Sequence, residues 1–136
     1  MAKKDAAIVT ALESVPLFAG CNKKQLRTIA ASGKLLKRMA GTTIVKEGVS
    51  GVGFFVILDG TANVLRGGDW VTRLTPGDFF GEMALLLDEK RNAEVVADDD
   101  CELFTLTRWA FKSIVLDNPP ISYSVMQAIA ERQAPS

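Results

Sequence analysis

The chain has 136 residues and no histidine. Histidine is the side chain that titrates near neutral pH and the commonest protein ligand of metals. Without an imidazole, the chain can form neither the Ser/His nor the Cys/His pair of a nucleophilic enzyme. Cupin enzymes are small proteins with a fold of two β-sheets, and their metal centres are usually built from histidine ligands as well. We therefore expect a protein that is not an enzyme and has no catalytic metal.

Cysteine is scarce too, since the chain has only Cys21 and Cys101. They lie far apart and show neither metal nor redox spacing, so we expect two packed thiols in a reducing compartment. The run Asp98-Asp99-Asp100 lacks the spaced acids of a calcium loop and is predicted to be a solvated turn. We expect no metal and no cofactor.

An excess of either charge is also lacking, because 16 basic residues face 16 acidic ones. The lysine and arginine pairs are scattered, whereas nucleic-acid binding needs a basic stripe, so we expect no nucleic-acid partner. No apolar run approaches the roughly 20 residues of a membrane helix. The first 14 residues have lysines but only a short apolar patch, unlike a signal peptide. We expect a cytoplasmic protein without a membrane segment.

The length predicts a single domain over residues 1–136. We expect N-terminal helices within residues 1–31: one over 5–14, and one that ends near Ala31 and begins with a capping pair, Asn22 and Gln25. We expect two C-terminal helices within residues 107–133. Thr107 is predicted to cap the first, which ends near Asp117. Asn118-Pro119-Pro120 then separates it from a last helix over 121–133, whose apolar face is expected to contain Ile121, Val125, Met126 and Ile129.

Between these helices, residues 34–106 alternate short β-like runs with glycine turns. The runs are 35–39, 43–46, 54–58, 61–65, 70–74, 91–96 and 103–106. Gly67-Gly68 suits a tight hairpin between two of them. This pattern predicts a mainly β protein, an eight-stranded jelly roll of Greek-key order with flanking helices.

The most informative stretch runs from Pro76 to Val96. Gly81 precedes a short apolar run that could form one helical turn, and such a turn leaves backbone N–H groups that can bind an anion. Arg91 returns nine residues after Glu82 and can meet the same anion. Glu82 would repel a phosphate but could accept a hydrogen bond from a hydroxyl, and a ribose phosphate carries both groups.

The residues Phe80-Gly81-Glu82-Met83-Ala84-Leu85, followed by Arg91-Asn92-Ala93, resemble the phosphate-binding cassette of cyclic nucleotide-binding domains, here over 80–93. The resemblance implies that Glu82 binds the ribose 2′-hydroxyl and Arg91 the cyclic phosphate. It extends over roughly residues 15 to 117, through the Pro-Leu-Phe step at 16–18 and the pattern from Gly41 to Val64. Lys90 stands where the family usually has proline, and Glu94 stands where it usually has Thr, Ser or Ala.

The resemblance implies a sensing module that binds cAMP, or cGMP, and signals to an effector protein or domain by rearranging its terminal helices, the last of which covers the base. Asn92 follows the arginine, at a position where polar groups contact either the phosphate or the amino group of guanine. An alternative is an interaction module of the same fold with a degenerate pocket, which Lys90 and Glu94 would favour. The sequence leaves both functions, and both nucleotides, open.

Overall fold

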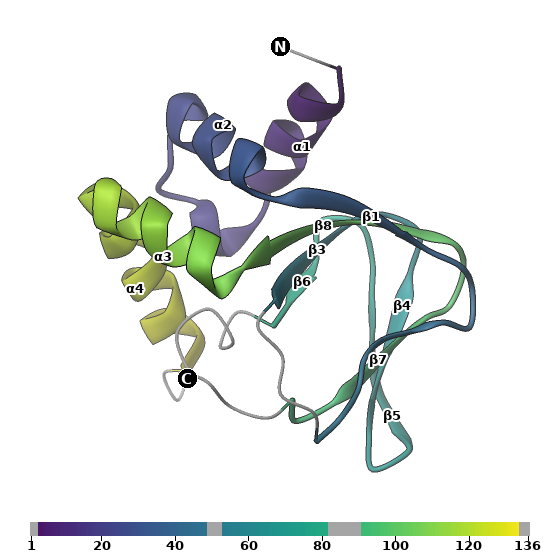
Figure 1. The fold of residues 1–136 in the computed structure, drawn as a ribbon. Helices are drawn as coiled ribbons and strands as arrows, with labels where there is room; N and C mark the ends of the chain where they lie inside the picture. Colours follow the sequence, from purple (N-terminus) through teal and green to yellow (C-terminus); the bar gives the residue numbers. More distant parts are fainter. Residues whose placement is uncertain (1–2, 49–52, 82–90, 134–136) are drawn as a thin grey trace.

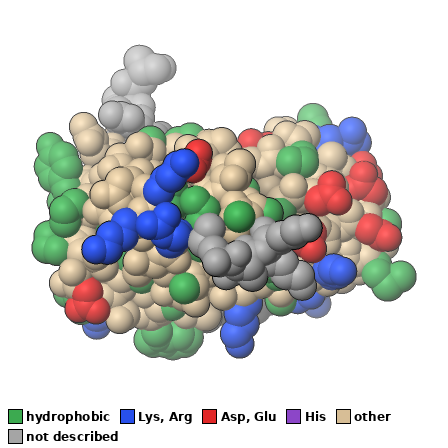
Figure 2. Space-filling model, turned by 90° about the horizontal axis from the view of Figure 1, so that it is seen from above, with side chains coloured by type: hydrophobic (Ala, Val, Ile, Leu, Met, Phe, Trp, Pro, Cys, Tyr) green, Lys and Arg blue, Asp and Glu red, His purple; other side chains and the backbone are tan. Residues whose placement is uncertain are grey.

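In the computed structural model, which describes residues 3–48, 53–81 and 91–133, the helices gather on one side of a β roll (Figure 1). No helix in these ranges is both long and apolar enough to cross a membrane. On the face drawn in Figure 2, Lys and Arg side chains form small groups rather than a continuous basic surface.

Four α-helices and one 3₁₀ helix lie within the described residues: α1 (Lys3–Glu13), η1 (Pro16–Phe18), α2 (Lys23–Ser32), α3 (Arg108–Asp117) and α4 (Pro119–Gln133). The predicted caps are present. Asn22 Oδ1 accepts a hydrogen bond from Gln25 N at 2.9 Å, and Asn22 N donates to Gln25 Oε1 at 2.8 Å. Thr107 Oγ1 accepts from Ala110 N at 3.2 Å. The last helix begins two residues earlier than predicted, because proline in a first turn loses no helical hydrogen bond.

Eight strands lie in the described ranges and form two four-stranded antiparallel sheets: β1 (Lys34–Arg38), β2 (Thr43–Val45), β3 (Gly53–Asp59), β4 (Ala62–Arg66), β5 (Asp69–Leu74), β6 (Phe79–Phe80), β7 (Glu94–Ala97) and β8 (Cys101–Thr107). Their order is β1-β8-β3-β6 in one sheet and β2-β7-β4-β5 in the other. The predicted jelly roll with flanking helices is therefore confirmed. The predicted hairpin is also present, since Gly67 and Gly68 join β4 to β5 with φ of +60° and +84°.

Two strand predictions were incomplete or wrong. β6 was not anticipated, because two residues are too few to show the alternation that marks a strand. The strand predicted over 91–96 begins only at Glu94. The carbonyl oxygens of Arg91 and Asn92 accept hydrogen bonds from Gly48 N and from Arg66 Nε, so neither carbonyl joins a regular ladder.

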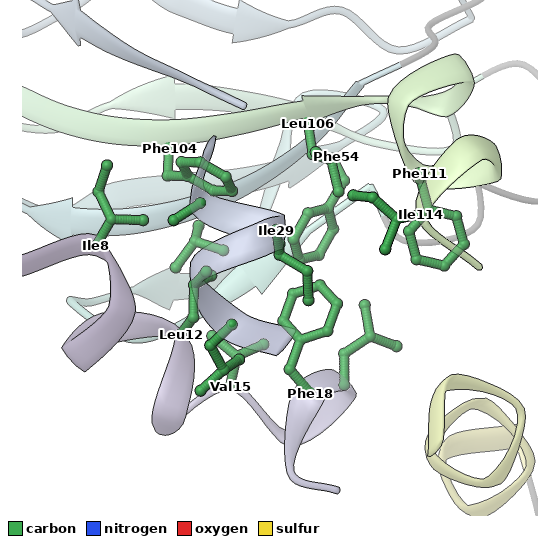
Figure 3. Packing of buried hydrophobic residues seen from close by; sticks show 14 of the residues in the cluster. Ile8, Leu12, Val15, Phe18, Ile29, Phe54, Phe104, Leu106, Phe111 and Ile114 are labelled. Atoms are coloured by element: carbon green, nitrogen blue, oxygen red, sulfur yellow. The ribbon is translucent and has the colours of Figure 1, made fainter. Parts of the chain in front are cut away.

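Alternation along β3 divides the apolar interior into two clusters. Phe54 and Val56 belong to a cluster with the helices, and Ile57 lies in a second cluster between the two sheets. In Figure 3, Phe54 meets Phe18 and Ile29 beneath the sheet. The Phe18 and Phe54 rings are edge to face, with centroids 5.8 Å apart. Each buried side chain of this size contributes about 1.5–3 kcal/mol to folding, so this cluster holds the helices on the sheet.

The last helix is anchored through part of its predicted apolar face. Ile121 and Val125 are buried in the helical cluster, where α4 packs against η1 and α3. Met126 was predicted on that face but is 61% exposed. Ile121 and Val125 are four residues apart and therefore lie on the same side of α4, where they make its contact with η1 and α3. Met126 follows Val125 directly, so its side chain is rotated away from that side of the helix. The side chain of Ile129 lies outside the described residues.

Candidate functional site

Gly81 and Arg91 come together in space, as the anion-site prediction requires. Gly81 has φ of +83°, a conformation that glycine adopts without strain. A Cβ atom added to it would lie 2.5 Å from Nη1 of Arg91. The glycine therefore leaves the space in which the guanidinium lies.

The Arg91 guanidinium is held by a backbone carbonyl. Its Nη2 donates a hydrogen bond to the oxygen of Gly53 at 2.6 Å, and the side chain is half-buried. Gly53 is the first residue of β3 and pairs with Thr107, the residue that caps α3. Hydrogen bonds from charged donors are short and strong, so this contact fixes the arginine at the end of the sheet nearest α3.

Phe80, at the end of β6, is packed inside the roll. Its ring stacks on Phe55 of β3, with centroids 5.0 Å apart and planes inclined by 14°. Phe80 also packs against the cluster between the sheets. It therefore anchors the backbone just before Gly81 to β3.

The residues after the arginine lie at the surface. Asn92 is exposed and Ala93 is half-buried. Glu94 begins β7, in which Val95 and Ala97 are the buried residues, so its side chain points away from the roll interior. Its Oε1 accepts a hydrogen bond from Thr43 Oγ1 at 3.3 Å. The departure at Glu94 from the family pattern thus places no carboxylate inside the roll.

Glu82, Met83, Ala84 and Leu85, and also Lys90, lie outside the described residues. The assignment of Glu82 to the ribose hydroxyl therefore stays a prediction, as does any ligand contact of the three apolar residues.

The acidic run at 98–100 closes the turn between β7 and β8. Asp99 Oδ1 accepts a hydrogen bond from Thr61 N at 2.6 Å, and Asp100 Oδ1 accepts from Ala40 N at 2.8 Å. Asp98 pairs with Arg73 at 3.2 Å. Among the described residues, no group of histidine, cysteine or acidic side chains is arranged to hold a metal ion. These acids have structural partners that explain their positions.

Both cysteines are free thiols with a raised pKa. Burial raises the pKa of Cys21. Burial is also the main cause at Cys101, where the nearby carboxylates, Asp99 first, raise the pKa further. Cys101 Sγ donates to the carbonyl oxygens of Thr61 at 3.1 Å and Asp99 at 3.3 Å. Neither thiol is activated as a nucleophile.

The sequence reasoning missed Gly53 and Arg66, which hold the side chain of Arg91 and the carbonyl of Asn92. Gly53 is one of 11 glycines in the chain, and Arg66 resembles any charged residue at a strand end. Both contacts join positions far apart in the chain, so no local pattern marks them.

Comparison with known proteins agrees with this geometry. The family model for the cyclic nucleotide-binding domain matches residues 36–118. The chain is 35% identical over 105 residues to the cAMP-dependent protein kinase regulatory subunit of Schizosaccharomyces pombe, covering 76% of this chain and 26% of that protein. It is 34% identical over 123 residues to cGMP-dependent protein kinase, isozyme 1, of Drosophila melanogaster, covering 80% of this chain and 15% of that protein.

A solved structure shows the same arrangement. The regulatory domain of Toxoplasma gondii PKA, determined with cAMP, superposes with a TM-score of 0.77 at 26% identity, over 93% of this chain and 50% of that chain. The present chain thus spans only part of its relatives. The family match covers both sheets of the roll, Gly81 and Arg91, and the chain belongs to the cyclic nucleotide-binding domain family.

Proposed function

We propose that this domain binds a cyclic nucleotide, cAMP in the first place and cGMP as the alternative, and acts as a regulatory module. The observation that carries the proposal is the position of the Arg91 guanidinium, beside Gly81 and hydrogen-bonded to Gly53. A half-buried guanidinium offers a planar fork that matches two phosphate oxygens. The names of the relatives, which include kinases dependent on each nucleotide, support this ligand class.

In this proposal the sugar and the phosphate are bound by different residues. Arg91 donates to the exocyclic oxygens of the cyclic phosphate, and the backbone N–H groups that follow Gly81 add donors. Glu82 accepts the hydrogen bond of the ribose 2′-hydroxyl. Phe80, Met83, Ala84, Leu85 and Ala93 line the cassette, and Asn92 lies beside the purine. No metal and no cofactor takes part.

The output of the module would be a rearrangement of the terminal helices that an effector protein or domain reads. Gly53, which holds Arg91, pairs with the residue that caps α3, so the proposed phosphate site and α3 share a strand end. We place this role in the cytoplasm and expect a regulatory rather than a catalytic function.

Titration calorimetry with cAMP and with cGMP tests the proposal. Wild-type protein should bind at least one of them, and Arg91→Ala should weaken that binding about 10- to 150-fold, the equivalent of about 1.5–3 kcal/mol for a hydrogen bond to a charged group. Arg27→Ala, which removes an exposed arginine on α2, serves as the matched control and should leave affinity unchanged. Equal affinity of wild type and Arg91→Ala would refute the assignment.

The same titration examines the ribose contact. Wild-type protein should discriminate against the 2′-deoxy nucleotide, and Glu82→Ala should abolish that discrimination while weakening binding of the parent compound. A mutant that still discriminates as wild type does would place the ribose contact on another residue. A wild-type protein that binds neither nucleotide would favour the degenerate interaction module.

A further inference from the structure

Three pairs of adjacent residues from three separate parts of the chain form a closed ring of hydrogen bonds that includes the backbone carbonyl of Arg91. Gly48 N donates to the oxygen of Arg91 at 2.8 Å. Glu47 Oε1 accepts from Gly67 N at 2.8 Å, and Arg66 Nε donates to the oxygen of Asn92 at 3.1 Å. Each bond ends next to the residue at which the following bond begins, so the ring closes through 47–48, 66–67 and 91–92.

The ring joins parts of the chain that no strand pairing joins at this point. Residues 47–48 follow β2, residues 66–67 are the last residue of β4 and the first residue of the turn to β5, and residues 91–92 precede β7. The carbonyls of Arg91 and Asn92 come before the first ladder pair of β7 with β4, which joins Glu94 to Leu65. The ring therefore replaces the missing ladder and sets the direction in which the backbone delivers the Arg91 side chain.

We propose that Glu47 and Arg66 are positioning residues for the phosphate-binding arginine. The ring holds the base of Arg91 while Gly53 holds its tip, so the guanidinium is oriented before a ligand arrives. Binding groups that are held in place by a surrounding shell of contacts lose less freedom when they bind. This inference rests on the proposed function for its effect on nucleotide binding, but the ring itself is a property of the protein without ligand.

The sign of the effect at Glu47 separates positioning from simple electrostatics. A carboxylate near an anion site repels the anion, so its charge alone predicts tighter nucleotide binding when it is removed. Positioning predicts the opposite, because loss of the acceptor for Gly67 N opens the ring. Glu47→Gln keeps an oxygen acceptor in place and removes the charge, and is therefore the conservative variant.

The binding arm uses calorimetry with the nucleotide that wild-type protein prefers. Glu47→Ala and Arg66→Ala should each weaken binding about fivefold, as expected for one ordinary hydrogen bond, and Glu47→Gln should stay within about twofold of wild type. The double variant should lose little more nucleotide affinity than either single variant, because each of the two substitutions already opens the same ring. Glu13→Ala, an exposed acid on α1, controls for the change in net charge. Tighter binding by Glu47→Ala, or no rescue by Glu47→Gln, overturns the proposal.

The second arm needs no nucleotide. Amide hydrogen exchange measured by NMR on ligand-free protein should be faster at Gly48 in Arg66→Ala, although Arg66 donates to the oxygen of Asn92 and Gly48 N donates to the oxygen of Arg91. Unchanged exchange at Gly48 would show that the bonds act separately and would overturn the ring. If wild-type protein binds neither nucleotide, the proposed function fails, and this arm still decides whether the ring holds the backbone of Arg91.

Discussion

The guanidinium of Arg91 occupies the space that a side chain at position 81 would need. A Cβ atom on Gly81 would lie 2.5 Å from Nη1 of Arg91 and 2.7 Å from the oxygen of Gly53, which is the acceptor that holds the guanidinium. The positive φ of Gly81 adds a second reason for glycine, independent of the available space. Gly81 thus allows the backbone to adopt a positive φ and also leaves space for the guanidinium of Arg91.

Gly81→Ala should therefore lose stability and nucleotide binding together. A residue with a Cβ atom in the left-handed conformation lowers the unfolding free energy by about 1–2 kcal/mol. Displacement of Arg91 should in addition weaken nucleotide binding about tenfold or more. Gly41→Ala is the matched control, since Gly41 has φ of +84° and would place no Cβ within 4 Å of other atoms. Urea denaturation and calorimetry measure the two effects. Both variants should lose stability, Gly81→Ala the more because its Cβ also meets Arg91 and the oxygen of Gly53, and only Gly81→Ala should lose affinity. Equal affinities in the two variants would contradict this prediction.

Asn92→Ala should cost cGMP more affinity than cAMP. The Asn92 side chain is exposed while its carbonyl is held by Arg66, so the substitution removes the amide group and leaves the backbone contact. A syn guanine can donate its amino group to the Asn92 side-chain oxygen, and adenine lacks that donor. We expect a loss of about fivefold for cGMP and less than about twofold for cAMP in calorimetry. Equal losses would remove Asn92 as a determinant of nucleotide choice.

Nucleotide binding should alter hydrogen exchange in the last helix. Ile121 and Val125 hold α4 on the helical cluster, whereas Tyr123 and Met126 are 65% and 61% exposed and available for a new contact. A ligand shifts this helix only if it binds one arrangement better than the other. Exchange followed by mass spectrometry should change in residues 118–133 together with 80–92 when ligand is added. A response confined to 80–92 would exclude α4 from the relay and direct attention to residues 5–31.

Cys101 should react slowly with alkylating reagents and should destabilise the protein at alkaline pH. Its pKa in the folded state is raised by burial and by nearby carboxylates, so the folded protein retains a proton that the unfolded chain has released. The contribution of the Cys101 thiol to the unfolding free energy is therefore at its full value below the ordinary thiol pKa of about 8.5. This contribution falls as the pH rises from that value through the raised pKa of the folded state. Iodoacetamide labelling between pH 7 and pH 10, read by peptide mass spectrometry, should show Cys101 lagging behind a free thiol. Labelling of native protein as fast as that of a free thiol would show that the site is open to solvent.

Sequence alone determined the features that depend on near neighbours. The capping box of Asn22 and Gln25, the Thr107 cap and the Gly67-Gly68 hairpin were all predicted, because each is decided by residues within a few positions of one another. The jelly roll followed from the spacing of short strands between glycine turns. A common site for Gly81 and Arg91 was expected, because only nine residues separate them in the chain.

Tertiary structure decided what distant residues do to one another. β6 exists because Phe79 and Phe80 pair with β3, and β7 begins late because Gly48 and Arg66 take the two carbonyls before it. The contact between Arg91 and Gly53, and the ring through Glu47, join positions about 20 to 40 apart in the chain. Such hydrogen bonds depend on direction and distance in three dimensions, which local composition does not encode. They form only once the two sheets have packed and brought these loops together.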